Sequence, residues 1–166
     1  MPKITVELSE ASLKAAVDEL NKYARWVERK TDELRSRLAT IGATAASIRF
    51  SRAIYNGTND VSVRVDDTGS VAVIYAEGKS VAFIEFGSGK KYGYGHPLAG
   101  QLGVGPGTYS DDESLGGRHH WDNPKGWYYG SGQHSYGNPP AQAMIAARDA
   151  IAENVARVAR EVFSHG

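Results

Sequence analysis

The sequence predicts an α+β fold: a long N-terminal amphipathic helix, a small antiparallel sheet, and a C-terminal helix packed on the sheet. Apolar residues recur at helical spacing in the first third of the chain and again near its end, and short alternating segments lie between them. The 166 residues, 41% of them hydrophobic, suit one domain with a real core. We therefore expect a single domain, residues 1–166, whose sheet carries a long glycine- and aromatic-rich insertion.

The first helical region is predicted at residues 9–56. From Leu13 to Ile48 the apolar positions are separated by alternating steps of four and three, which keeps them on one face of a helix. Ser9 or Ser12 can cap its start, because a hydroxyl accepts from the unpaired N–H groups of the first turn. The dipeptide Asn56-Gly57 is the expected end.

Three arrangements fit this apolar stripe: a self-paired coiled coil, one long helix packed on its own domain, or two helices broken near Thr31 or Gly42. Packing within the domain is favoured, because Ala24, Thr31 and Ala45 are small for a dedicated coiled-coil seam. We expect so long a helix to project beyond its own sheet and to leave part of the stripe for a neighbour.

The strands are predicted within residues 59–86. Asp60–Val65 alternates, with its valines on one face, and Ser70–Gly78 is its partner in a hairpin that turns at Asp66–Gly69. Val81–Phe86 is either a third strand or a short helical turn, since its length does not decide between them.

Residues 87–138 form the extended insertion or arm. They hold fourteen of the nineteen glycines, half of the aromatic residues and four of the five histidines. Gly126–Ser131 is the best candidate for a further strand that returns to the sheet. The insertion is either an arm laid on a neighbour or an Ω-like loop over its own sheet. Its residues expected to contact a subunit or partner are Lys90, Lys91, Tyr92, Tyr94, Tyr109, Trp121, Trp127, Tyr128, Tyr129 and Tyr136.

A C-terminal helix is predicted at residues 139–163. Pro139 and Pro140 suit its start, because proline lacks only an N–H that would be unpaired there. An apolar stripe follows, and charged residues face away from it. The stripe consists of Met144, Ala147, Ile151, Val155, Val158 and Val162.

Composition excludes several classes of function. Nineteen basic residues balance nineteen acidic ones, so there is no general reason to expect nucleic acid or an anionic membrane as the main partner. The absence of cysteine excludes disulfide scaffolds, thiol nucleophiles and cysteine metal clusters. No signal-peptide core or membrane span is present, so we expect a soluble protein made in the cytoplasm.

The glycine-rich stretch FIEFGSGKKYGYG, Phe83 to Gly95, invites comparison with a phosphate-binding loop. That motif requires Ser or Thr after the lysine, and a first glycine that would fall at position 84. Lys91 and Ile84 occupy these positions, and a helix cannot begin in the glycine-rich residues that follow. The phosphate-loop interpretation is therefore rejected.

Histidines and acidic residues of the insertion give the alternative of a small metal-dependent hydrolase. Adjacent histidines usually point apart, and the spacing that would place two imidazoles on one face is missing. A nucleophile elbow is missing as well. We therefore expect no enzyme activity, no metal and no cofactor. The residues considered for this alternative are Asp111, Asp112, Glu113, His119, His120, Asp122, Ser131 and His134.

Two further features each have a functional and a structural interpretation. Glu85, between Ile84 and Phe86, is either a buried general base or a carboxylate that pairs with a basic residue or accepts backbone N–H bonds, and the second is favoured. The lysines and tyrosines of residues 90–94 are either a small nucleic-acid patch or a solvated loop tip, and two lysines are little charge to hold a polyanion.

Two motifs follow one another along the chain: VAFIEFGSG, Val81–Gly89, and YGNPPAQAMIAARDAI, Tyr136–Ile151. The first is similar to an aliphatic-aromatic-Glu-Phe-Gly-Thr/Ser-Gly signature, and the second to a step into the last helix. Both are features of the gene-product-ten-like family of tailed bacteriophages, which are small neck or tail-component proteins, and the chain resembles this family. The N-terminal helix and the hairpin also correspond. The chain departs from the family pattern in its longer insertion and in Met144, where phenylalanine is frequent.

The resemblance implies a structural virion component without catalysis or cofactor. It would form a homo-oligomeric ring, a hexamer or dodecamer, at the head–tail interface or the head-proximal end of the tail, after assembly in the host cytoplasm. The implied partners are portal or adaptor connector proteins and tail-terminator or tail-tube proteins, with passive contact to DNA in the channel and none with a membrane. Tail terminator or minor capsid protein is the alternative role. The implied turn and hinge residues are Phe83, Glu85, Phe86, Gly87, Gly89, Gly137, Pro139 and Pro140.

Overall fold

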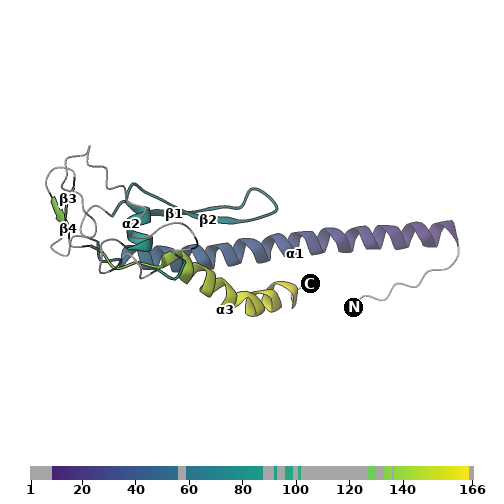
Figure 1. Ribbon diagram of the computed structural model, residues 1–166. Helices are drawn as coiled ribbons and strands as arrows, with labels where there is room; N and C mark the ends of the chain where they lie inside the picture. Colours follow the sequence, from purple (N-terminus) through teal and green to yellow (C-terminus); the bar gives the residue numbers. More distant parts are fainter. Residues whose placement is uncertain are drawn as a thin grey trace.

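The computed structural model describes residues 9–55, 59–87, 92, 96–98, 101, 127–129, 133–135 and 137–164, with the backbone alone for the sixth and seventh of these ranges. Its fold is α+β, as predicted, with a long N-terminal helix, a two-stranded antiparallel sheet and a C-terminal helix that packs chiefly on the long helix and meets the sheet beside Gly42 (Figure 1). The elements in chain order are α1 (Glu10–Ser51), β1 (Ser62–Asp66), β2 (Val73–Glu77), α2 (Val81–Phe86), β3 (Trp127–Tyr129), β4 (Gln133–Ser135) and α3 (Ala143–Ser164).

The helix α1 is continuous through Thr31 and Gly42, so the alternative of two broken helices is wrong. Ser9 is its cap, as the sequence suggested, and its Oγ accepts from the N–H of Ser12 at 3.3 Å. The helix ends at Ser51, before the expected Asn56-Gly57. One of its last carbonyls is satisfied from outside the helix, because the carbonyl of Phe50 accepts from the side-chain amide of Asn59 at 2.9 Å.

Two layers pack on the C-terminal half of α1. In Figure 1 the β1–β2 hairpin lies along one side of the helix and α3 along the other. The buried residues of α1 are the small residues Ala39, Gly42 and Ala46, and Phe50. Ile48, which belongs to the predicted stripe, is 45% exposed instead. Burial follows a neighbouring line on the helix, because α1 has partners on two sides and small residues let both approach closely.

At Gly42 the hairpin and α3 both approach α1 closely. A Cβ atom at this position would lie 2.6 Å from Cδ1 of Ile74 in β2 and 2.7 Å from Cδ1 of Ile151 in α3. Both atoms are ends of flexible side chains. Side chains of the sheet and of the C-terminal helix therefore both reach α1 at Gly42, the one residue in this helix that has no side chain.

Substitutions at Gly42 should separate helix propensity from packing. We expect Gly42→Ala to stay within about 1 kcal/mol of the wild type, because the gain in helix propensity offsets the displacement of two isoleucine methyl groups. We expect Gly42→Leu to destabilise by about 2–3 kcal/mol, because the junction has no room for it. Urea denaturation measures both, and equal stability of the two variants would contradict this packing.

The hairpin is antiparallel, as predicted, with Ser62 opposite Glu77 and Asp66 opposite Val73. Its tip is tied to α1, since Nε of Arg35 donates to Oδ1 of Asp67 at 2.6 Å. This hydrogen bond is the main reason that the pKa of Asp67 lies below its usual value. The hairpin thus runs beside the middle of α1 and ends near Arg35.

Val81–Phe86 forms the short helix α2, so the third strand considered within residues 59–86 is not formed. Asp60 holds the residues that precede this helix, because its carboxylate accepts from the N–H groups of Lys79 at 2.9 Å and Ser80 at 3.3 Å. These bonds lower the pKa of Asp60. In α2, Ile84 is only 1% exposed and belongs to the main core, with Ala46 and Phe50 of α1 and Ala143 and Ala147 of α3.

The helix α3 begins at Ala143, beyond the two prolines that were expected at its start. Along the predicted stripe, Ala147, Val158 and Val162 are buried, whereas Val155 is 41% exposed. The far end of α3 packs on α1 through an edge-to-face contact between Phe163 and Trp26, with ring centroids 5.8 Å apart.

The strand expected within Gly126–Ser131 is β3, but it does not return to the first sheet. β3 pairs with β4 in a separate two-stranded antiparallel sheet, with Trp127 opposite Ser135. The expectation of a return to the sheet is wrong, because pairing with the next few residues closes a much shorter loop.

The N-terminal part of α1 extends past both α3 and the hairpin, as Figure 1 shows. Apolar side chains on this part are about half exposed: Leu13 50%, Val17 54%, Leu20 56% and Tyr23 51%. The predicted projection of the helix is therefore present. Among the described residues, α1 and the other helices lack the combination of length and apolar character needed to cross a membrane.

Candidate functional site

The end of α2 meets the start of α3 in a contact that we call the Glu85 junction, formed by Glu85, Gly87, His96 and residues 138–144. The sequence motif around Glu85 and the motif around the two prolines lie against each other here. The carbonyl of Ile84 accepts from the N–H of Ala141 at 2.8 Å, and the carbonyl of Glu85 accepts from the N–H of Gln142 at 3.3 Å. Two segments far apart in the chain are thus joined through their backbones.

Glu85 caps α3 from a distance of 58 residues in sequence. Its side chain is buried, with the residue 5% exposed, and Oε2 accepts from the N–H of Ala143 at 2.7 Å. Oε1 accepts from the N–H of Met144 at 3.1 Å. These are N–H groups of the first helical turn, which have no partner within the helix, and the carboxylate also lies at the positive end of the helix dipole.

His96 completes the surroundings of the carboxylate. It is 4% exposed, and its Nε2 lies 3.2 Å from Oε1 of Glu85. Its Nδ1 accepts from the N–H of Leu98 at 3.1 Å, which places the proton of the neutral ring on Nε2, so that Nε2 donates to Glu85. The imidazole also makes an edge-to-face contact with Phe86, with ring centroids 4.5 Å apart.

The bonding of Glu85 matches the structural interpretation of this residue. Its carboxylate oxygens accept from three N–H groups of the protein, two from the backbone and one from an imidazole. A general base needs an oxygen directed at a substrate proton. Here each oxygen is directed at a proton donor that holds α2, α3 and His96 together.

Gly87 makes the turn that leads away from α2. Its φ of 76° and ψ of 172° fall in a region that is essentially restricted to glycine. A Cβ atom here would lie 2.8 Å from the carbonyl oxygen of Asn138 and 2.9 Å from the nitrogen of Pro140. The first and last residues of the insertion at 87–138 therefore meet at one point.

An apolar cavity of about 340 Å³ lies beside the Glu85 junction. Its walls include Phe50, Val81, Phe86, Met144 and Ile145, with Glu85 and His96 among the lining residues. This volume is at the lower end of the range for small-molecule sites. Since the carboxylate and the imidazole are bonded to each other, the cavity offers mainly a surface for an apolar group.

The structure brings together most of the predicted hinge residues. Glu85, Phe86 and Gly87 lie at the junction, and Pro140 lies against Gly87. Pro139 precedes it, and Gly137 adopts a positive φ of 94°. Gly89 lies outside the described residues.

Few of the predicted interface residues fall in the described part of the chain. Tyr92 is half-buried. Trp127, Tyr128 and Tyr129 are described by backbone alone, in β3. The remaining interface residues lie outside the described part: Lys90, Lys91, Tyr94, Tyr109, Trp121 and Tyr136.

The residues of the hydrolase alternative also fall almost entirely beyond the described ranges. Only the backbone of His134 is described, in β4. Within the part of the chain that the structure describes, His, Asp and Glu residues form no group of three or more that could hold a metal ion. The residues outside it are Asp111, Asp112, Glu113, His119, His120, Asp122 and Ser131.

Sequence reasoning missed His96 as the partner of Glu85. The only signal was its place among the histidines of the insertion, which does not distinguish a buried histidine from an exposed one. Asn138, 4% exposed, was missed because a polar residue at the end of a glycine-rich segment is usually exposed. Both lie where the two ends of the insertion approach the core.

Comparisons with protein-family models, with curated proteins and with solved structures found no significant match to this chain. The family resemblance of the two motifs therefore stays a prediction from sequence.

Proposed function

We propose that this chain is a structural assembly subunit of a tailed-bacteriophage virion. In this proposal it forms a homo-oligomeric ring at the head–tail interface or the head-proximal end of the tail, and joins the head connector to the tail. It acts through contacts with copies of itself and with neighbouring proteins. A tail terminator or minor capsid protein would act through the same kind of contact.

The observation that carries the proposal is the apolar side of the projecting part of α1. Leu13, Val17 and Leu20 repeat on one face and are each at least half exposed. Contiguous exposed apolar side chains usually mark a site of interaction with another protein. A helix that extends past its own domain with such a face suits a subunit whose surface is covered on assembly.

The Glu85 junction supports the same proposal. It fixes both ends of the insertion at one point of the core, through Gly87 and Asn138. Because both ends of the insertion are held at the core, its aromatic residues start from a fixed position on the subunit when they contact a neighbour. The two motifs at this junction resemble those of a family of neck and tail components, and this resemblance is the reason for proposing a phage neck or tail as the assembly.

Electron microscopy of the purified chain mixed with connector and tail-tube proteins tests the proposal. We expect closed rings, because head-to-tail contacts repeated around an axis close into rings. Replacing Tyr109 and Trp121 together with alanine should reduce ring formation, whereas Glu153→Gln, on the exposed side of α3, should not. A chain that forms no ring with either partner would overturn the proposal.

A further inference from the structure

We propose that, before assembly, two copies of this chain pair through the projecting part of α1, antiparallel and related by a two-fold axis. The surface involved is called the exposed stripe and consists of Leu13, Val17, Leu20 and Ala24, which lie on one face of the helix and leave it open to a partner. The occupant of the stripe is the same stripe of a second copy. This pairing goes beyond the proposed ring, whose contacts are head-to-tail.

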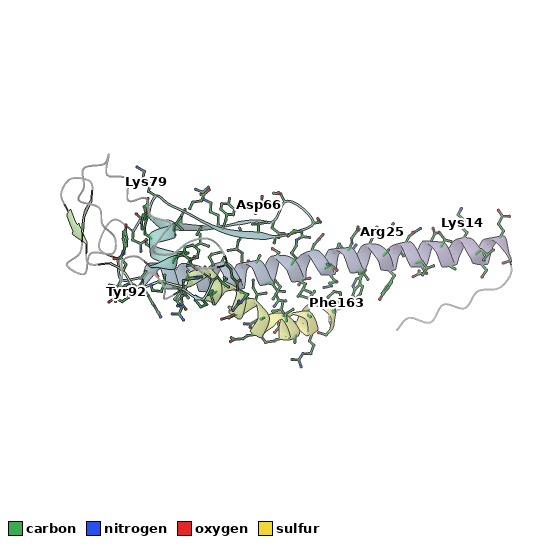
Figure 2. The ribbon with its side chains drawn as sticks, in the orientation of Figure 1. Lys14, Arg25, Asp66, Lys79, Tyr92 and Phe163 are labelled. Carbon is green, nitrogen blue, oxygen red and sulfur yellow. The ribbon has the colours of Figure 1, made fainter. Side chains whose placement is uncertain are left out.

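The stripe continues a face that is already an interface within the chain. Farther along α1, Arg35 and Gly42 lie on the same face by helical spacing, where Arg35 bonds to Asp67 at the hairpin tip and Gly42 packs against Ile74 of β2. On this face the covered part ends at the hairpin tip, beside Arg35. Figure 2 shows Arg25 and Lys14 on the part of α1 that extends past Phe163. From Glu10 to Arg25 this part is about 24 Å long, at 1.5 Å per residue.

An aromatic residue stands at the boundary between the covered and the exposed parts. Tyr23 stacks on Trp26 with ring centroids 5.6 Å apart and is still 51% exposed. Tyr23, Trp26 and Phe163 thus form a row that runs round α1 from the α1–α3 contact to the edge of the exposed stripe. A second helix laid on the exposed stripe would meet this row at Tyr23.

The order of side-chain sizes along the stripe favours an antiparallel pair. With Val17 opposite Leu20 of the second copy, Leu13 falls opposite Ala24 of the second copy, and the two-fold axis passes between residues 18 and 19. Each layer then joins a larger with a smaller side chain. A parallel pair would instead place Ala24 opposite itself and leave a gap, which close-packed interfaces avoid.

The residues beside the stripe also complement one another in this register. On one edge the ring of Tyr23 falls beside Ala16 of the second copy, where a small residue leaves room for it. On the other edge Arg25 falls near Glu10 of the second copy, and Lys14 near Asn21 of the second copy. Opposite charges thus meet at both ends, and antiparallel helix dipoles add to the preference.

The pair should be weak. Four layers of side chains on a helix of this length bury less than the roughly 1,200–2,000 Å² of a standard protein interface. We expect dissociation in about the micromolar range, so that the pair forms in concentrated free protein and opens when another subunit competes for the stripe.

Disulfide cross-linking tests the register, because the chain has no cysteine of its own. Leu13→Cys and Ala24→Cys are prepared as separate full-length proteins, mixed at about 50 µM and oxidised, a concentration chosen for pairing in the micromolar range. We expect a cross-linked dimer in the mixture and only background in either protein alone. In the proposed pair, position 13 of one copy lies far along the axis from position 13 of the other, and the same holds for position 24. A disulfide needs Cα atoms within about 7 Å, so neither protein can cross-link with itself in this register.

Two matched controls are used. Lys22→Cys, on the opposite face of α1, mixed with Leu13→Cys measures collisional background. Adding Leu20→Glu to both cross-linking proteins should reduce the dimer to that background, while circular dichroism shows unchanged helix content, since Leu20 is 56% exposed. Cross-linking of Leu13→Cys with itself, or no dimer above background in the mixture, would overturn the proposed pair.

The outcome is separate from that of the ring experiment. Cross-linking uses the chain alone, whereas the ring requires connector and tube proteins. A chain that cross-links in the expected register and forms no ring overturns the proposed function alone, and a chain that forms rings without cross-linking overturns the pair alone.

Discussion

Replacing Glu85 with alanine is expected to lower the free energy of unfolding by about 3–5 kcal/mol. The substitution leaves the N–H groups of Ala143 and Met144 without their acceptor and removes the partner of Nε2 of His96. Each buried donor left unsatisfied costs about 1–3 kcal/mol, and the helix also loses its cap. Guanidinium denaturation followed by tryptophan fluorescence measures the loss.

Two further variants make this result specific to the cap. Glu85→Gln keeps one oxygen acceptor and should lose less, about 1–2 kcal/mol. Glu77→Ala removes an exposed carboxylate that is paired with Arg64 and should cost less than about 1 kcal/mol. In Glu85→Ala, hydrogen exchange should rise at the amides of Ala143 and Met144 more than in the middle of α3. If Glu85→Ala proves as stable as Glu77→Ala, the carboxylate does not hold the junction.

Replacing Gly87 with alanine is expected to cost about 3 kcal/mol or more, for two independent reasons. Its backbone conformation is strained for any residue with a side chain, which costs about 1–3 kcal/mol. The added Cβ would also lie 2.8 Å from a backbone oxygen and 2.9 Å from a backbone nitrogen, which cannot move aside as a flexible side chain can. Thermal and urea denaturation both report the change.

Gly69, in the hairpin turn, gives the matched control. A Cβ there meets no atom within 4 Å, so Gly69→Ala should leave the stability within about 0.5 kcal/mol of the wild type. Equal stability of Gly87→Ala and Gly69→Ala would show that the ends of the insertion are not packed as closely as described. A loss of stability in Gly87→Ala but not in Gly69→Ala would show that the turn after α2 requires glycine at position 87.

The two predictions concern one structural unit. Glu85 and Gly87 are separated by one residue, yet the first fixes the start of α3 and the second fixes the course of the chain into the insertion. The stretch that first suggested a phosphate-binding loop is thus a connection between core elements. Gly87 is required because the backbone of Asn138 and Pro140 approaches it closely. The carboxylate of Glu85 is required because it accepts from two backbone N–H groups of α3.

Features that depend on local patterns could be predicted from the sequence. The apolar spacing from Leu13 onward identified α1, the alternation in Asp60–Val65 identified the hairpin, and Ser9 was one of two candidate caps. The projection of α1 also followed, because its 42 residues extend about 60 Å, more than a small sheet can cover. Such patterns repeat every few residues and require no knowledge of distant neighbours.

The places where separate segments meet were set by tertiary packing. α1 was expected to bury its apolar stripe, but with partners on two sides it buries a line through Gly42 instead. Val81–Phe86 was ambiguous by length, and contacts of Asp60 and Ile84 with the rest of the domain make it a helix. Glu85 could be identified as a structural carboxylate, but its acceptance of N–H bonds from α3 and its contact with His96 could not. These partners lie 58 and 11 residues away in the sequence. Hydrogen bonds over such separations depend on where the packed elements bring their ends together. The local repeat of apolar residues carries no information about this.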